Sequence, residues 1–151
     1  KLGHIPVKRE SAEAREESYQ NILNVAKSRT SLFLCPEGAI YMNDKLLNEM
    51  RNGAFRVAIE SQMPLVAITM VNAGELFPPH KLRIRPGKCI NYMSAPFETT
   101  AINMNDIDTL RESIKEEILG NLLKHYPDGK YPIEFEPKEY EETVYQCNHN
   151  K

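Results

Sequence analysis

Residues 65–71 have the sequence LVAITMV, an almost uninterrupted apolar run that is rich in β-branched side chains. A run of this kind, without alternating polar residues, is typical of a central strand covered on both faces, as in parallel sheets. It follows a helical pattern that ends before Pro64. We therefore predict that residues 65–71 form a buried central strand of the fold.

The segments before this run alternate between helical and strand patterns. Ser11 suits a helix N-cap, and apolar side chains recur at helical spacing over residues 19–26. Residues 31–35 form a short apolar run that stops at Pro36, which predicts a second buried strand. Residues 53–59 then carry the apolar face of another helix.

Downstream, a turn at residues 85–88 separates two stretches that alternate as half-buried strands do, and residues 107–122 place apolar side chains on one helix face. This order predicts an α/β fold, a mixed and partly parallel sheet flanked by helices. We expect residues 1–125 to form one domain and residues 126–151 to form an extended acidic tail. Because the chain begins with Lys1 rather than Met, we expect it to start inside a longer protein, with a fold that is incomplete at its N-terminal side.

Composition excludes several classes of function. The 151 residues carry a net charge of −2, which argues against a broad nucleic-acid-binding surface. No apolar run approaches the ~20 residues that a membrane-spanning helix needs. Cys35, Cys89 and Cys147 have neither metal-ligand nor disulfide spacing, so we expect no metal site and a reducing compartment.

Four short motifs follow one another along the first half of the chain. They are GHIPVKR at residues 3–9, LCPEG at 34–38, MRNGAF at 50–55 and MPLVAI at 63–68. In this order and spacing they resemble the phospholipid and glycerol-phosphate acyltransferase superfamily, specifically the 1-acylglycerol-3-phosphate acyltransferases. They are similar in turn to the family motifs Gly-x-Ile-Phe-x-x-Arg, Phe-Pro-Glu-Gly-Thr-Arg-Ser, Phe-Lys-x-Gly and Val-Pro-Ile-Val-Pro-Val. The resemblance continues into residues 85–96.

The resemblance implies a fatty acyl transfer. In the family, a histidine of a His-x-x-x-x-Asp motif takes the proton from a glycerol hydroxyl, which attacks an acyl thioester. The expected partners are acyl-CoA or acyl carrier protein, a lysophospholipid such as lysophosphatidate, and the membrane surface. The parent protein is then expected in the cytoplasm, peripheral to or anchored at the cytoplasmic face of the membrane. No cofactor is implied.

The catalytic motif itself is absent from this sequence. In the family it lies upstream of the Gly-x-Ile motif, and none of the four histidines here is followed by Asp at the fifth position. We therefore assign no catalytic residue to this chain.

The resemblance also implies substrate-binding residues. Arg9 and Arg51 would hold the phosphate with their guanidinium groups, while Glu37 and Gly38 would shape the wall beside it. We expect Arg9 and Glu37 at adjacent strand ends, on one side of the sheet around a concave site. Ile40 stands where the family has Arg, which removes a phosphate contact of the kind worth ~1.5–3 kcal/mol.

Alternatives to this function remain open. One alternative is that the chain is part of a superfamily acyltransferase with another acceptor. The other is a non-catalytic α/β module that binds a phosphorylated or acylated ligand, which agrees with Ile40 standing where the family has Arg. A His-x-x-x-x-Asp motif upstream of Lys1 would identify an enzyme. For Cys35 we favour a buried strand-end cysteine over a thiol nucleophile.

If further strands and helices cover residues 65–71 in the parent, the chain alone should expose an unpaired strand edge or an apolar patch. We expect possible self-association through that surface. Light scattering over a concentration series tests this expectation, and a stable monomer with a fully covered sheet would contradict it.

We predict that residues 1–151 alone transfer no acyl group from acyl-CoA to lysophosphatidate, because the chain holds no positioned base. A thioester-cleavage assay of the purified chain measures this, and turnover above background would show the prediction to be wrong.

Overall fold

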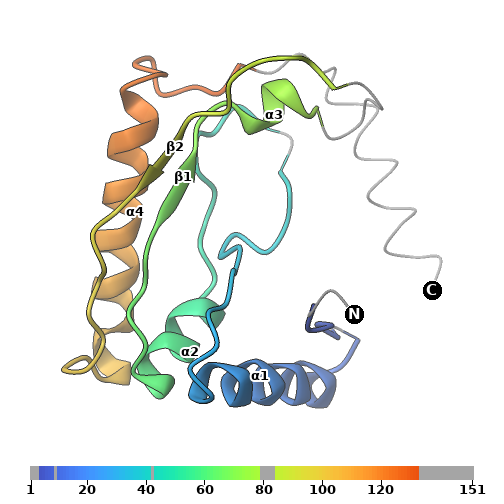
Figure 1. Ribbon diagram of the computed structural model, residues 1–151, viewed down its shortest axis with the longest axis vertical. Helices are drawn as coiled ribbons and strands as arrows, with labels where there is room; N and C mark the ends of the chain where they lie inside the picture. Colours follow the sequence, from blue (N-terminus) through green and yellow to red (C-terminus); the bar gives the residue numbers. More distant parts are fainter. Residues whose placement is uncertain (1–3, 9, 42, 79–83, 133–151) are drawn as a thin grey trace.

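A small two-stranded sheet lies along the longest helix of this protein, and two other helices pack against each other at one end of it (Figure 1). The computed structural model describes residues 4–8, 10–41, 43–78 and 84–132. The elements are α1 (Ala12–Lys27), α2 (Gly53–Ser61), β1 (Ile68–Met70), α3 (Ala73–Leu76), β2 (Asn91–Met93), the 3-10 helix η1 (Met104–Asp106) and α4 (Ile107–Leu123).

The three long helices were expected, and local signals account for them. The Ser11 side chain accepts a hydrogen bond from the backbone N–H of Ala14 (3.1 Å), which caps α1. One face of α1 packs on α2, with Leu23 and Ala26 buried. At the same contact the Arg56 guanidinium lies 4.4 Å from the centre of the Tyr19 ring. The helices predicted at these positions are therefore confirmed.

The sheet differs from the prediction in direction and in cover. β1 pairs antiparallel with β2, with Thr69 opposite Tyr92, so the expected partly parallel sheet is not confirmed. Ala67, Thr69 and Val71 are buried on the face that α4 covers. The alternate side chains of residues 66, 68 and 70 are exposed, so the prediction of a strand covered on both faces is wrong. An apolar run indicates that a strand can be buried on both faces, but burial of the second face also requires another layer of helices or strands to cover it.

The predicted strand at residues 31–35 is also absent from the structure. The segment is extended without strand pairing, and Phe33 is 68% exposed. Cys35 is exposed, so the expectation of a buried cysteine is wrong. Among the predicted half-buried strands, β2 confirms the one that follows residues 85–88. The turn predicted at residues 85–88 is not formed, and Ile84 before it is not in a strand. Residues 79–83 lie outside the described part of the chain.

The core forms where α2, β1 and α4 meet. Apolar side chains of α2 and α4 pack with Ala67. The buried Met50, which precedes α2 in the chain, belongs to the same cluster. Leu47, Leu65, Phe97, Ile102 and Ile118 pack around the outside of this cluster. The buried members of the cluster are Met50, Phe55, Ile59, Ala67, Ile107, Leu110 and Ile114.

The ordered structure continues beyond the expected domain end at residue 125. The Tyr126 hydroxyl lies 2.9 Å from the carbonyl oxygen of Val71 and 2.6 Å from Glu75 Oε1. Burial and the nearby Glu75 carboxylate raise the pKa of Tyr126, so it stays a hydrogen-bond donor. The backbone N–H of Tyr131 donates to the carbonyl of Asp44 (2.8 Å). Residues 133–151 of the expected tail lie outside the described residues.

One buried hydroxyl joins the end of α2 to the chain that follows β2. Thr99 is fully buried, and its Oγ1 donates to the carbonyl of Met63 (2.9 Å), with the carbonyl of Ala58 at 3.3 Å. A buried carbonyl that loses its donor costs more free energy than the hydrogen bond itself contributes.

We predict that Thr99→Val, which keeps the side-chain shape but removes this donor, lowers the free energy of unfolding by about 1–3 kcal/mol. Urea denaturation followed by circular dichroism measures the change. The matched control is Thr100→Val at the neighbouring exposed position, expected within about 0.5 kcal/mol of the parent chain. Equal effects of the two substitutions would contradict the role given to the Thr99 hydroxyl.

Candidate functional site

The Cys35-Pro36-Glu37-Gly38 segment forms a tight turn. The backbone N–H of Gly38 donates to the carbonyl of Cys35 (3.1 Å), and Gly38 has a φ of +73°. This left-handed conformation disfavours side chains, so glycine is required by the backbone itself. A Cβ at Gly38 would also lie 3.2 Å from both Cδ and Nε of Arg51. Glycine therefore serves two purposes here, the turn and the close passage of Arg51.

Glu37 is half-buried and is held by the loop that follows the turn. Its Oε2 accepts a hydrogen bond from the backbone N–H of Asn48 (2.9 Å). The Asn48 side chain in turn accepts from Asn43 Nδ2 (2.8 Å). Sequence reasoning did not find Asn48, because the contact uses a backbone N–H that any residue except proline carries. The Glu37 carboxylate is thus a fixed part of the turn.

Arg51 is positioned at its backbone and open at its guanidinium group. Its N–H donates to the carbonyl of Pro36 (2.9 Å), which places its side chain along Gly38. Arg51 is exposed, and no carboxylate within the described residues forms an ion pair with it. A guanidinium with free donors suits a phosphate, which it can bind through two parallel hydrogen bonds.

Of the four residues predicted for the site, the structure brings together Glu37, Gly38 and Arg51. Arg9 lies outside the described residues, so its place near Glu37 stays a prediction. The adjacent Lys8 lies against α1, where its backbone N–H donates to Ser18 Oγ (2.8 Å) and its Nζ is 3.2 Å from Glu17.

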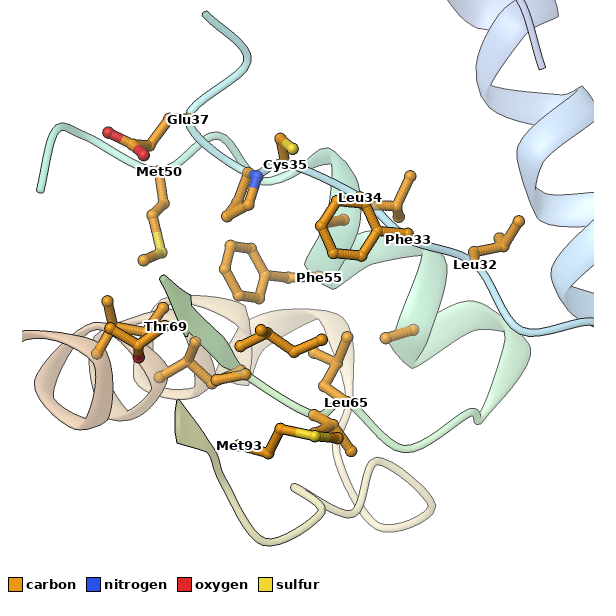
Figure 2. A pocket seen from close by; sticks show the side chains of 18 of the residues that line it. Leu32, Phe33, Leu34, Cys35, Glu37, Met50, Phe55, Leu65, Thr69 and Met93 are labelled. Carbon is orange, nitrogen blue, oxygen red and sulfur yellow. The ribbon is translucent and has the colours of Figure 1, made fainter. Parts of the chain in front are cut away.

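An apolar cavity of about 680 Å³ begins beside the turn. Figure 2 shows the Glu37 carboxylate at the edge of the cavity beside Met50, with Phe55 farther in among the apolar side chains. Residues 31–36 line one part of the wall and residues 63–71 another. Side chains from α2 and α4 close the remainder. The polar turn and the apolar cavity are therefore neighbouring parts of one region.

The described histidines do not form a catalytic pair. His4 and His125 are both exposed, and His125 Nε2 lies 2.8 Å from the Tyr92 hydroxyl rather than from a carboxylate. Ile40, which stands where the family motif has arginine, is 67% exposed, and its side chain has no group that binds phosphate. The described residues contain no cluster of His, Cys, Asp or Glu that would hold a metal ion. None of their helices is both long enough and apolar enough to cross a bilayer.

Comparison with known proteins identifies relatives over the same region. A family model described as Acyltransferase matches residues 1–71. The mouse (Mus musculus) 1-acyl-sn-glycerol-3-phosphate acyltransferase alpha is 26% identical over 99 residues, which cover 65% of this chain and 34% of the relative. The Brassica napus 1-acyl-sn-glycerol-3-phosphate acyltransferase BAT2, chloroplastic, is 29% identical over 77 residues, 51% of this chain and 22% of the relative.

The Saccharomyces cerevisiae 1-acyl-sn-glycerol-3-phosphate acyltransferase is 23% identical over 111 residues, 73% of this chain and 37% of the relative. No solved structure matches the chain. The chain thus spans about a third of the length of the mouse relative. The matched residues 1–71 include the turn, Glu37, Gly38 and Arg51. These matches support the resemblance of the chain to the phospholipid and glycerol-phosphate acyltransferase superfamily.

Proposed function

We propose that this chain is part of an acyltransferase that moves a fatty acyl group from a CoA or carrier-protein thioester to lysophosphatidate or a related glycerolipid. The observation that carries the proposal is the placement of Arg51. Its backbone is bonded to the turn at Pro36, its side chain passes along Gly38, and its guanidinium is open to an anion. In this proposal Arg51 holds the phosphate of the acceptor.

Holding the phosphate contributes to catalysis through orientation. A bound phosphate fixes the glycerol backbone, so that the free hydroxyl meets the thioester carbon in line. Arg9 is the second cation expected to take part. The base that removes the hydroxyl proton belongs to a His-x-x-x-x-Asp motif that is not in this sequence. The relatives named as 1-acyl-sn-glycerol-3-phosphate acyltransferases support this acceptor, and the cytoplasmic membrane surface is its proposed source.

A second candidate function is binding without catalysis. Exposed Ile40 stands where the family motif has Arg, so one of the family's phosphate contacts is missing. A module that only binds a phosphorylated or acylated ligand would tolerate this loss better than an enzyme that must hold its substrate in line. An acyl-transfer assay on the longer parent protein separates the two candidates, because only the enzyme consumes thioester.

We predict that Arg51→Gln weakens the binding of a short-chain lysophosphatidate about 10- to 100-fold, because a charge-assisted hydrogen bond is worth ~1.5–3 kcal/mol. Isothermal titration of the purified chain measures the affinity. The control is Arg29→Gln, which removes the same charge from another exposed arginine that lies outside the turn at residues 35–38. Equal affinity losses in both variants would show that only the net charge of the chain matters. Unchanged affinity in Arg51→Gln would contradict the role of Arg51 in phosphate binding.

We predict that Gly38→Ala lowers the free energy of unfolding by ~1–2 kcal/mol, the cost of a left-handed conformation for a residue with a Cβ. It should also weaken lysophosphatidate binding, because the new methyl group displaces the Arg51 side chain. The matched control is Gly120→Ala in α4, where a Cβ meets no atom within 4 Å. There alanine should stabilise the chain by roughly 0.5–1 kcal/mol. Similar stabilities of the two variants, measured in urea, would contradict this account of the turn.

A further inference from the structure

β1 has one paired edge and one free edge. Leu65 exchanges backbone hydrogen bonds with Phe97, Ala67 accepts from the N–H of Ser94, and the N–H of Val71 donates to Ile90. Backbone groups of successive residues point to opposite edges of a strand. The N–H and carbonyl groups of residues 66, 68 and 70 therefore point away from β2. Among the described residues no strand lies on that side, since the sheet contains only β1 and β2.

The apolar cavity occupies the space beside this free edge. Its lining includes Val66, Ile68 and Met70 from the uncovered face of β1. It also includes residues 114, 118 and 122 of α4, which covers the opposite face. A cavity bounded by side chains from both faces of a sheet lies in the plane of that sheet, which is the position of a neighbouring strand.

A second extended segment lines the same cavity. Residues 31–35 carry the apolar sequence SLFLC, and no strand of the described residues pairs with them. Figure 2 shows Leu32, Phe33 and Leu34 at one side of the cavity and Leu65 and Met93 at another. One wall of the cavity is therefore an extended apolar segment without a strand partner, and another is the apolar segment at residues 65–71, which is paired along one edge only.

We propose that the cavity binds one extended, uncharged, apolar polypeptide strand from outside residues 1–151, which pairs with the free edge of β1. The occupant extends the sheet beyond β1 and buries Val66, Ile68 and Met70. The inference concerns the apolar cavity alone and does not depend on phosphate binding at Arg51.

The polar groups of the cavity favour a polypeptide over a hydrocarbon chain. Val66, Ile68 and Met70 present backbone donors and acceptors at the free edge, and a polypeptide strand satisfies them as a fatty acyl chain does not. Thr69 supplies a further group, because it is 3% exposed, lines the cavity, and its Oγ1 has no hydrogen-bond partner in the described part of the chain. Covering these groups with hydrocarbon would leave them without water or protein partners, which is unfavourable.

The edge also lacks the features that keep strands from pairing. Natural edge strands are protected by Lys, Pro or inward-pointing charges, and residues 65–71 contain none of these. The acidic residues 133–151 are poorly suited to an apolar site, since an inserted strand would bury unpaired carboxylates. A second copy of the chain would insert its β1 together with the β2 that is paired to it. That β2 would lie on the far side of the inserted strand, toward the wall formed by residues 31–35. A single strand from outside residues 1–151 fits both walls.

Amide hydrogen exchange of the complete chain by NMR tests the proposal. The probe is a peptide with the sequence of residues 65–71, flanked by lysines for solubility, because it has the apolar, β-branched character that the site requires. The peptide should slow exchange at the amides of residues 66, 68 and 70 by tenfold or more. A version of the peptide N-methylated at alternate residues, which loses the donors on its pairing edge, should give no protection, and oleate should give none.

Substitutions in the chain test the same site from the other side. Ile68→Lys places a charge at the cavity and should reduce peptide affinity at least tenfold. Ile84→Lys changes another exposed isoleucine that does not line the cavity, and should leave the affinity unchanged. Circular dichroism checks that both variants keep their helices. Three results would overturn the proposal: protection by oleate, equal protection by the N-methylated peptide, or protection that rises with chain concentration without peptide, which indicates a second copy.

Discussion

The burial of α2 and β1 against α4 is the interaction on which the other parts of this structure depend. Water is excluded from a cluster of apolar side chains that these elements share. Its members include Phe55 and Ile59 of α2, Ala67 beside β1, and Leu110 and Ile114 of α4. Because α2 directly follows Arg51 and β1 follows α2, this cluster sets the position of the turn that precedes both. Hydrophobic burial is non-directional, so it brings the segments together without deciding their hydrogen-bond pairing.

The direction of each polar group in the site is decided by a few hydrogen bonds. The N–H groups of Arg51 and Asn48 bond to Pro36 and Glu37, and the conformation of Gly38 leaves space for the Arg51 side chain. A cation held in this way loses less conformational entropy on binding an anion than a freely rotating one. The turn therefore fixes the course of the Arg51 side chain beside Gly38, while the Glu37 carboxylate accepts its hydrogen bond from the backbone N–H of Asn48.

The uncovered side of β1 is the second consequence of the same packing. α4 covers only one face of a strand whose composition suits burial on both. The chain therefore retains apolar side chains and backbone hydrogen-bonding groups that face a cavity, a combination that suits another strand better than it suits solvent. The apolar patch expected for a chain without further strands and helices over residues 65–71 is present, since Phe33, Val66, Ile68, Met70 and Met93 are all substantially exposed.

Local physical chemistry made much of the helical structure predictable from the sequence by itself. The Ser11 cap and the spacing of apolar residues determine α1, and the same spacing determines α2 and α4. The family motifs likewise indicated Glu37, Gly38 and Arg51, which the structure brings together. Only the tertiary structure decided that β1 pairs antiparallel with β2, that residues 31–35 remain without a strand partner, and that Asn48 holds Glu37. The direction of strand pairing, the burial of each strand face and the backbone hydrogen bonds all depend on residues distant in the chain. An apolar run or a short motif does not specify which distant residues these are.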